Sequence, residues 1–345
     1  MKRGVLVSVF SLFGLLVPTA WSGSTDKCLD IHWIDVEGGA ATLLVTPAGE
    51  SILIDTGLPG LRDPVRILRH VRRVAKLEKI DHLVITHFDR DHYGGAADLS
   101  RLMPIGRVYD HGVRPQDVAR VGEDYLNFKC ERRLVLTPGD RLPLKQIDGG
   151  PRLEARCLAS LRHFVEPGPE HAENPLPDNA VEGKPDQSHN GNSIVLLFRF
   201  GDFEFFDGAD LTWQLEQRLV VPWNLVGEVD VYQTNHHGLA SSNNPVLIHS
   251  LKPRVAVMNN GHRKGAAPST FAALRSSPGL DAIYQGHKTL VPDNIGLNEP
   301  EEFIANLPAS EECKAHPILL SVAPDGKRYT VSVPSRGHEK TYATR

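Results

Sequence analysis

The sequence has few cysteines and no excess of basic residues, and both absences limit what the protein can be. Only four cysteines occur among 345 residues, Cys28, Cys130, Cys157 and Cys313. None stands in a Cys-x-x-Cys pair, which excludes a zinc knuckle or a thioredoxin-like redox site. In an exported protein these four could form disulfides in three pairings, or all could stay free thiols. The formal net charge is −4, whereas nucleic-acid-binding proteins usually carry a basic excess, so nucleic acid is not the favoured partner.

Long apolar runs are absent except at the N-terminus. Lys2 and Arg3 precede an apolar run over residues 5–17, and small residues follow it. That order is typical of a cleavable signal peptide and is too short for a comfortable membrane span. We therefore expect residues 1–22 to be removed, leaving a secreted or periplasmic chain with no stable membrane association. An uncleaved anchor is the alternative.

The remaining composition is that of a soluble globular protein. Hydrophobic residues make up 41% and charged residues 23% of the chain, which is ordinary. Strand-like and helix-like segments alternate, which favours an α/β sandwich built as one domain over residues 23–345. Expected strands cover 29–36, 41–45, 51–54, 80–85, 107–109, 193–200, 202–206, 229–234 and 255–258. Expected helices cover 63–77, 96–102, 213–219, 245–251 and 270–275. The Pro-, Glu- and Asn-rich stretch 164–189 predicts a long loop of the kind that often serves as a lid or binding loop.

Residues 86–95 hold the most informative pattern of the chain. His87, Asp89, Asp91 and His92 place four metal-ligand side chains within six residues, directly after the apolar strand. Imidazole nitrogens and carboxylate oxygens are ligands for Zn²⁺ and similar cations. The alternative is a polar loop that holds these residues by chance. The spacing and the two following glycines favour a metal site, and one strand end cannot supply every ligand for two ions.

Partner ligands are found at other strand ends. Asp210 follows the strand at 202–206, His236 and His237 follow the strand at 229–234, and His189 ends the long loop. A carboxylate can bridge two metal ions about 3.5–4 Å apart, and Asp210 is our choice for that bridge. His236 is preferred over His237 as a ligand, and Asn190 could take the place of His189.

At this point the sequence resembles the metallo-β-lactamase superfamily, nearest to its competence-protein-like branch of DNA-uptake hydrolase domains. The resemblance covers about residues 28–300. It is carried by segments 35–41, 53–57, 87–92, 192–193, 208–210 and 236–242. It implies the αββα fold, two mixed β-sheets packed face to face with helices outside, and a metal cleft at one edge.

The resemblance also assigns the ligands of two divalent ions. It implies that His87, Asp89 and His189 hold the first, that Asp91, His92 and His236 hold the second, and that Asp210 lies between them. The commonest superfamily pattern has histidine where Asp89 stands. An oxygen ligand there makes Mn²⁺ or Fe²⁺ plausible beside Zn²⁺. The branch usually has Gly-His-Pro near residues 265–268, where this chain has no histidine, and His262 is the candidate substitute.

The expected activity is hydrolysis by a metal-activated hydroxide. Asp91 is expected to orient the nucleophile or accept its proton, and Asp55 to orient a ligand histidine. A rim of loop residues suits a small anionic substrate and favours a phosphomonoester or phosphodiester. These candidate substrate-binding residues are Arg90, His111, Arg114, His237, His262 and Lys264. The alternatives are hydrolysis of a β-lactam, lactone or other carboxyl ester or amide, and a non-catalytic binding protein with a decayed site.

Overall fold

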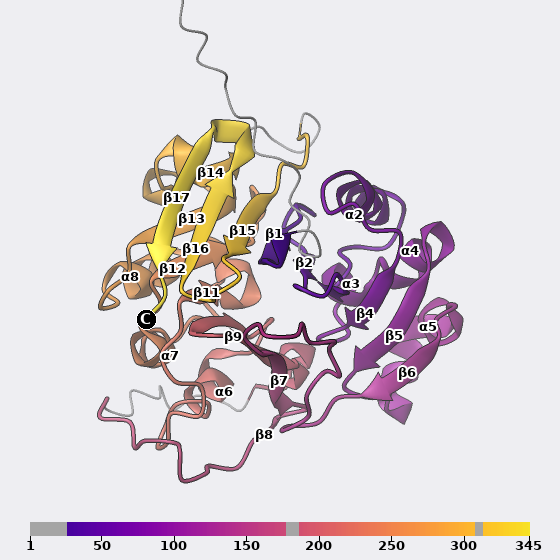
Figure 1. The fold of residues 1–345 in the computed structure, drawn as a ribbon, viewed down its shortest axis with the longest axis horizontal. Helices are drawn as coiled ribbons and strands as arrows, with labels where there is room; N and C mark the ends of the chain where they lie inside the picture. The colour runs from indigo at the N-terminus through magenta and orange to yellow at the C-terminus, as the bar shows by residue number, and fades with distance from the viewer. Residues whose placement is uncertain (1–25, 177–185, 308–312) are drawn as a thin grey trace, which may run out of the picture.

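The computed structural model describes residues 26–176, 186–307 and 313–345, and shows two β-sheets packed face to face with helices outside them (Figure 1). The expected fold class is therefore confirmed. The predicted signal peptide lies outside the described residues, as do residues 177–185 of the predicted long loop. Among the described residues, no helix is both long and apolar enough to cross a membrane.

The first sheet has nine strands in the order β17-β16-β15-β1-β2-β3-β4-β5-β6. Their bounds are β1 Leu29–Trp33, β2 Thr42–Val45, β3 Ser51–Ile54, β4 Ile80–Val84, β5 Ile105–Asp110, β6 Arg132–Val135, β15 Ile318–Val322, β16 Arg328–Val333 and β17 His338–Ala343. Helices α2 (Arg62–Arg73), α3 (Arg90–Tyr93), α4 (Ala96–Leu102) and α5 (Val118–Asn127) accompany this sheet.

The second sheet has eight strands in the order β14-β13-β12-β11-β10-β9-β7-β8. Their bounds are β7 Leu153–Ser160, β8 His163–Phe164, β9 Val195–Phe200, β10 Phe203–Asp207, β11 Val231–Gln233, β12 Val255–Met258, β13 Ala282–His287 and β14 Ile304–Asn306. Helices α6 (Trp213–Gln217), α7 (Pro245–Leu251) and α8 (Pro268–Arg275) accompany it. The predicted hairpin at residues 201–202 is present, since Phe200 and Phe203 pair across it.

The main core lies between the two sheets. Trp33 of β1 packs edge-on against Phe205 of β10, and Phe205 stacks on Phe198 of β9. All three side chains are buried, and each buried aromatic ring of this kind contributes roughly 1.5–3 kcal/mol to folding. A strand that is covered on both faces is buried along its whole length. This explains why the central strands are continuous apolar runs in the sequence.

Two groups of parallel strands decide where functional residues gather. In the first sheet β3, β4 and β5 run parallel to one another, and in the second sheet β10, β11 and β12 do so. Their carboxyl ends therefore deliver the residues that follow them to common edges, as in other α/β folds. Asp55, the 86–95 turn, Asp210 and the His236–His237 pair all follow such ends.

The C-terminal part of the chain differs from the expectation. No strand was expected after residue 258, yet β13 and β14 extend the second sheet and β15, β16 and β17 extend the first. β15 pairs antiparallel with β1, so the first strand of the chain lies in the interior of its sheet. The first expected strand also ends earlier, at Trp33 rather than at residue 36.

Candidate metal centre

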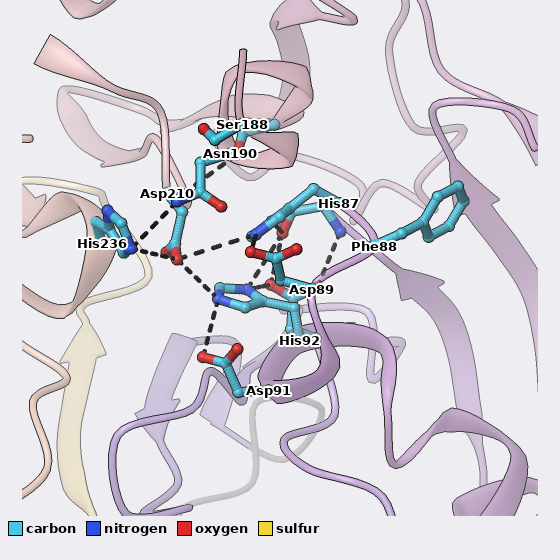
Figure 2. Close-up of polar contacts among 12 residues, drawn as sticks. His87, Phe88, Asp89, Asp91, His92, Ser188, Asn190, Asp210 and His236 are labelled. Carbon is cyan, nitrogen blue, oxygen red and sulfur yellow. Dashed lines mark hydrogen bonds and ion pairs between the residues drawn. The ribbon is translucent and has the colours of Figure 1, made fainter. Parts of the chain in front are cut away.

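One buried carboxylate lies among four imidazole rings. The Oδ2 atom of Asp210 is 3.1 Å from Nε2 of His92, 3.4 Å from Nε2 of His236, 3.6 Å from Nε2 of His237 and 3.9 Å from Nε2 of His87. Figure 2 shows His87, His92 and His236 turned toward this carboxylate. Asp210 therefore lies at the centre of the site, where a carboxylate bridging two metal ions would be.

The turn after β4 supplies the other carboxylates. Asp89 precedes the short helix α3 with an extended backbone, which lets α3 carry Asp91 and His92 toward Asp210. Oδ2 of Asp91 is 3.5 Å from Nε2 of His92 and 3.3 Å from Nε2 of His237. Asp89 is at the outer edge, with Oδ2 3.8 Å from Nε2 of His87 (Figure 2). The motif thus faces the centre from one side.

His236 and His237 reach the centre through an unusual backbone turn. Both have positive φ, 53° and 56°, and Gly238 follows at 81°. The left-handed region costs a non-glycine residue roughly 1–2 kcal/mol, so this turn needs outside support. This left-handed backbone conformation directs the side chains of both consecutive histidines toward Asp210, whereas in a strand they would point to opposite faces.

Glu216 supplies much of that support and was not anticipated from the sequence. This fully buried carboxylate accepts hydrogen bonds from Asn235 Nδ2 at 2.6 Å, from Asn243 N at 2.7 Å and from Asn244 N at 2.7 Å. Asn243 in turn donates to the carbonyl of Asn235 at 2.9 Å. A glutamate on a short helix gives no local signal that it holds a turn nineteen residues away.

A second close approach fixes the same turn. Gly265 has φ 82°, and a Cβ built on it would be 1.8 Å from the carbonyl oxygen of His237. Ala266 N donates to that carbonyl, and Ala267 N donates to the carbonyl of Gly238 at 2.8 Å. Only glycine fits at position 265, and this packing positions the neighbouring Lys264, whose ammonium group pairs with Asp91.

Asp55 orients one of the four rings. Its Oδ2 is 2.7 Å from Nδ1 of His92, which directs Nε2 of that ring at Asp210. The same carboxylate accepts hydrogen bonds from Thr86 N at 2.9 Å and Thr86 Oγ1 at 2.7 Å. A carboxylate behind a histidine is the usual way to fix the orientation of a metal ligand.

The electrostatics suit a cation. Burial lowers the pKa of His87 well below its ordinary value, so this ring stays neutral and able to ligate. Burial would raise the pKa of Asp210, but His92 and His237 hold it well below its usual range. Burial would lower the pKa of His92, but Asp210 and Asp55 raise it well above its ordinary value. Negative charge on Asp210 therefore recruits positive charge to the centre.

The residues present fit divalent metal ions. One ligand atom from each of Asp91, His92, Asp210 and His237 lies within 4.8 Å of all the others. Nε2 of His87 is buried and makes no hydrogen bond within the described residues, although two carboxylates lie just beyond reach. A neutral imidazole nitrogen that lies 3.8–3.9 Å from two carboxylate oxygens is suited to coordinate a metal ion together with them. We describe this group as the candidate metal centre.

The predicted ligands outside this group occupy different positions. His189 lies in the 3₁₀ turn η2 (His189–Asn192), and it is its neighbour Asn190 whose Nδ2 is 3.2 Å from Nε2 of His236 (Figure 2). His237, predicted as substrate-binding, joins the four-residue group, while His236 contacts Asp210 and Asn190. Ligation by His189 and His236 stays a prediction.

The predicted substrate-binding residues divide into two sets. Arg90 is exposed beside the centre, and Lys264 pairs with Asp91. By contrast, Arg114 forms a bidentate pair with Asp117, at 2.7 and 3.1 Å. His111 is buried against the ring of Phe88, and the ring of His262 lies 6.0 Å from that of His287. Arg120, which the sequence did not single out, pairs with Asp89 at 2.8 Å.

All four cysteines are free thiols. None of the three conceivable disulfide pairings is formed. The alternative of four free buried thiols is right about the free thiols, but only Cys157 is buried and the other three are partly exposed.

Comparison with family models gives a match over part of the chain. Residues 34–183 match the family model described as the metallo-beta-lactamase superfamily. A metallo-β-lactamase superfamily domain model thus covers 150 of the 345 residues. The matched segment contains β2 to β8 and the 86–95 turn, and the two-sheet architecture agrees with it.

Similar proteins are found in bacteria and fungi. Recombination protein 2 of Haemophilus influenzae is 26% identical over 263 residues, which are 75% of this chain and 27% of that protein. ComE operon protein 3 of Bacillus subtilis is 24% identical over 246 residues, 67% of this chain and 28% of that protein. Thioesterase pkgB of Emericella nidulans is 35% identical over 102 residues, 29% of each chain.

The two broader matches agree with the competence-like branch that the motifs indicated. The chain spans less than a third of the length of each of these relatives. Among solved structures, the diiron β-hydroxylase CmlA from Streptomyces venezuelae is similar, with a TM-score of 0.44, 15% identity, and coverage of 74% of this chain and 52% of that one.

Proposed function

We propose that this protein is a metal-dependent hydrolase that acts on phosphoesters. The observation that carries the proposal is the Asp210 carboxylate, held among the Nε2 atoms of four histidines and next to Asp91. In this proposal His87, Asp89 and Asp210, with His236 or His189 beside them, would hold one ion. Asp91, His92, Asp210 and His237 would hold the other. Bound divalent ions would polarise the ester and make water a nucleophile at neutral pH.

The residues of the chain have separate tasks in this proposal. Asp55 fixes the ring of His92 so that its Nε2 faces Asp210. Asp91 is the candidate to orient the attacking water. Burial would raise the pKa of Asp91, but His92, His237 and Lys264 hold it far below the usual value, so this group is an anion at neutral pH.

Two cations support a phosphoester over an uncharged substrate. Lys264 is held beside the centre by Asp91, and Arg120 is held there by Asp89. Each of these carboxylates is also a candidate metal ligand, so a metal ion competes with the cation for it. A substrate phosphate is then the anion that each released cation can bind, and arginine and lysine are suited to it.

The similar proteins also support an alternative activity. The match to a thioesterase favours hydrolysis of a carboxyl-type ester, in line with the alternative drawn from the sequence. Another relative is described only as a metal-dependent hydrolase, 30% identical over 93 residues. Export to the periplasm or the medium remains part of the proposal, with the basic and apolar N-terminal residues as its support.

The test is a substrate screen on metal-loaded protein. Purified chain is loaded with Zn²⁺ or Mn²⁺ and assayed on p-nitrophenyl phosphate, bis-p-nitrophenyl phosphate, short DNA, an aryl thioester and nitrocefin. We expect turnover of a phosphate ester and its loss on chelation. Turnover confined to the thioester or nitrocefin would overturn the phosphoester proposal. Metal-loaded protein that hydrolyses none of them would favour a binding protein.

A further inference from the structure

A second cluster of metal-ligand side chains lies apart from Asp210. Asp35 follows β1, His287 ends β13, and Cys313 precedes β15, so the three come from distant parts of the chain. Oδ1 of Asp35 is 2.6 Å from Nε2 of His287, and Oδ2 of Asp35 is 3.1 Å from Sγ of Cys313. One ligand atom from each of the three lies within 4.8 Å of the others.

We propose that Asp35, His287 and Cys313 form a separate site for one zinc ion. A carboxylate oxygen, an imidazole nitrogen and a thiolate sulfur are a donor set that zinc binds well and that hard cations such as Mg²⁺ do not. Asp35 and His287 are buried, as is usual for structural zinc sites. This site could not be recognised in the sequence, because no two of its ligands lie near each other along the chain.

The charges of the cluster balance when zinc is bound. Zn²⁺, the Asp35 carboxylate and a Cys313 thiolate sum to zero beside a neutral imidazole, so no net charge is buried. Arg66 is 3.5 Å from Asp35 but pairs more closely with Glu37, at 2.6 Å, and remains neutralised there. Burial raises the pKa of the Cys313 thiol to about 12. On binding zinc that thiol would release its proton to solvent, as zinc thiolates do.

Space for a further ligand is present next to Asp35. A cavity of about 20 Å³ is lined by Asp35, His316 and Asn260 among others. Although most of its lining is apolar, a cavity of this size has room for one water molecule beside the Asp35 carboxylate. A water molecule in this cavity would be the fourth ligand of a tetrahedral zinc ion.

The site would stiffen the segment that covers the candidate metal centre. Ala40 N donates to the carbonyl of Asp91 at 3.0 Å, and a Cβ on Gly39 would be 2.7 Å from that same oxygen. Zinc at Asp35 would fix the start of this segment to β13 and to the chain before β15. The role of this zinc ion would be structural. The proposal of a zinc site is therefore independent of the proposed phosphoesterase activity.

Cobalt substitution tests the proposal, because no cysteine is among the residues of the candidate metal centre. In full-length protein loaded with Co²⁺ we expect a sulfur-to-cobalt charge-transfer band in the near ultraviolet. Cys313→Ser should abolish the band and lower bound zinc by one ion per chain. The matched controls Cys130→Ser and Asp210→Asn should both keep the band, which separates this site from the catalytic proposal.

X-ray absorption at the zinc edge of the unaltered protein provides a second measurement that does not depend on the folding of a variant. Sulfur scattering at about 2.3 Å is expected. Absence of both the cobalt band and the sulfur scattering would overturn the proposal, leaving a hydrogen-bonded Asp–His–Cys cluster. A band that persists in Cys313→Ser would overturn it as well.

Discussion

Two buried aspartate–histidine pairs in this protein have nearly the same geometry and different surroundings. Asp55 lies 2.7 Å from Nδ1 of His92, and Asp35 lies 2.6 Å from Nε2 of His287. The free nitrogen of His92 faces Asp210 at 3.1 Å. The free nitrogen of His287 is buried without a hydrogen-bond partner within the described ranges of the chain. In the first pair the aspartate acts from behind a ligand, whereas in the second it is itself the proposed ligand.

The difference shows that what surrounds such a pair decides its use. Around His92 are further carboxylates and imidazoles, enough donors for two ions and a substrate. Around His287 are one carboxylate and one thiol, enough for a single ion. An isolated Asp–His contact therefore says little about function, and the neighbouring donors determine whether the site is suited to catalysis or to holding the fold.

The largest expected effect is that of Asp210→Asn. Removing the shared carboxylate should lower metal binding at the first centre and hydrolysis by more than about 100-fold, because changing even the partners of metal ligands costs about 10–100-fold. Metal content and turnover would be measured together. Asp110→Asn is the matched control, since Asp110 is also buried at a strand end but bonds Tyr125. Full activity in Asp210→Asn would refute the bridging role.

The next effect separates the two pairs. Asp55→Asn should lower metal affinity and activity about 10–100-fold by releasing the ring of His92, and should leave the cobalt–sulfur band intact. Asp35→Asn should remove the band and leave turnover at saturating metal within about a few-fold. Metal titrations of both variants check this reciprocity. Loss of activity and band together in either variant would mean that the two clusters are one functional unit.

The smallest expected effect concerns the strained turn at His236 and His237. Glu216→Gln keeps one oxygen acceptor for Asn235 Nδ2 and Asn243 N but replaces the other by an amide donor facing Asn244 N. It should cost about 1–3 kcal/mol of unfolding free energy and weaken metal binding. Glu204→Gln is the control, since it disrupts a partly exposed pair with Arg199 worth about 0–1 kcal/mol. Urea unfolding measures both. Equal costs in the two variants would show that Glu216 has no special role in holding the turn.

The sequence predicted those site residues that directly follow a single buried strand. Residues 86–95 and Asp210 follow buried strands, and apolar strands ending in metal-ligand residues are visible in a single sequence. His189 shows where this reasoning becomes weak. The sequence of a loop does not show which of two adjacent residues faces the site. In the folded turn it is Asn190, rather than His189, whose side chain contacts His236.

Features that depend on distant contacts could not be predicted. Asp35 and His287 are 252 residues apart in sequence, and Glu216 holds a turn through backbone groups of residues 243 and 244. Among the C-terminal strands that were missed, β17 is largely exposed, so it lacks the continuous apolar run by which the buried strands were recognised. β15 does have such a run and is buried, so it could have been recognised as a strand, but not its pairing with β1.

The pairing of β1 with β15 has a consequence for how the molecule forms. Asp30 and Ser321, which are hydrogen-bonded across these strands, stand 291 residues apart. At roughly 5–20 residues per second of synthesis, β1 would leave the ribosome about 15 to 60 s before its neighbour exists. During that interval an apolar strand has one unpaired edge, where aggregation and chaperone binding compete with folding. Truncations from the C-terminal end should therefore reduce the yield of soluble protein more strongly than the catalytic activity of the protein that remains soluble.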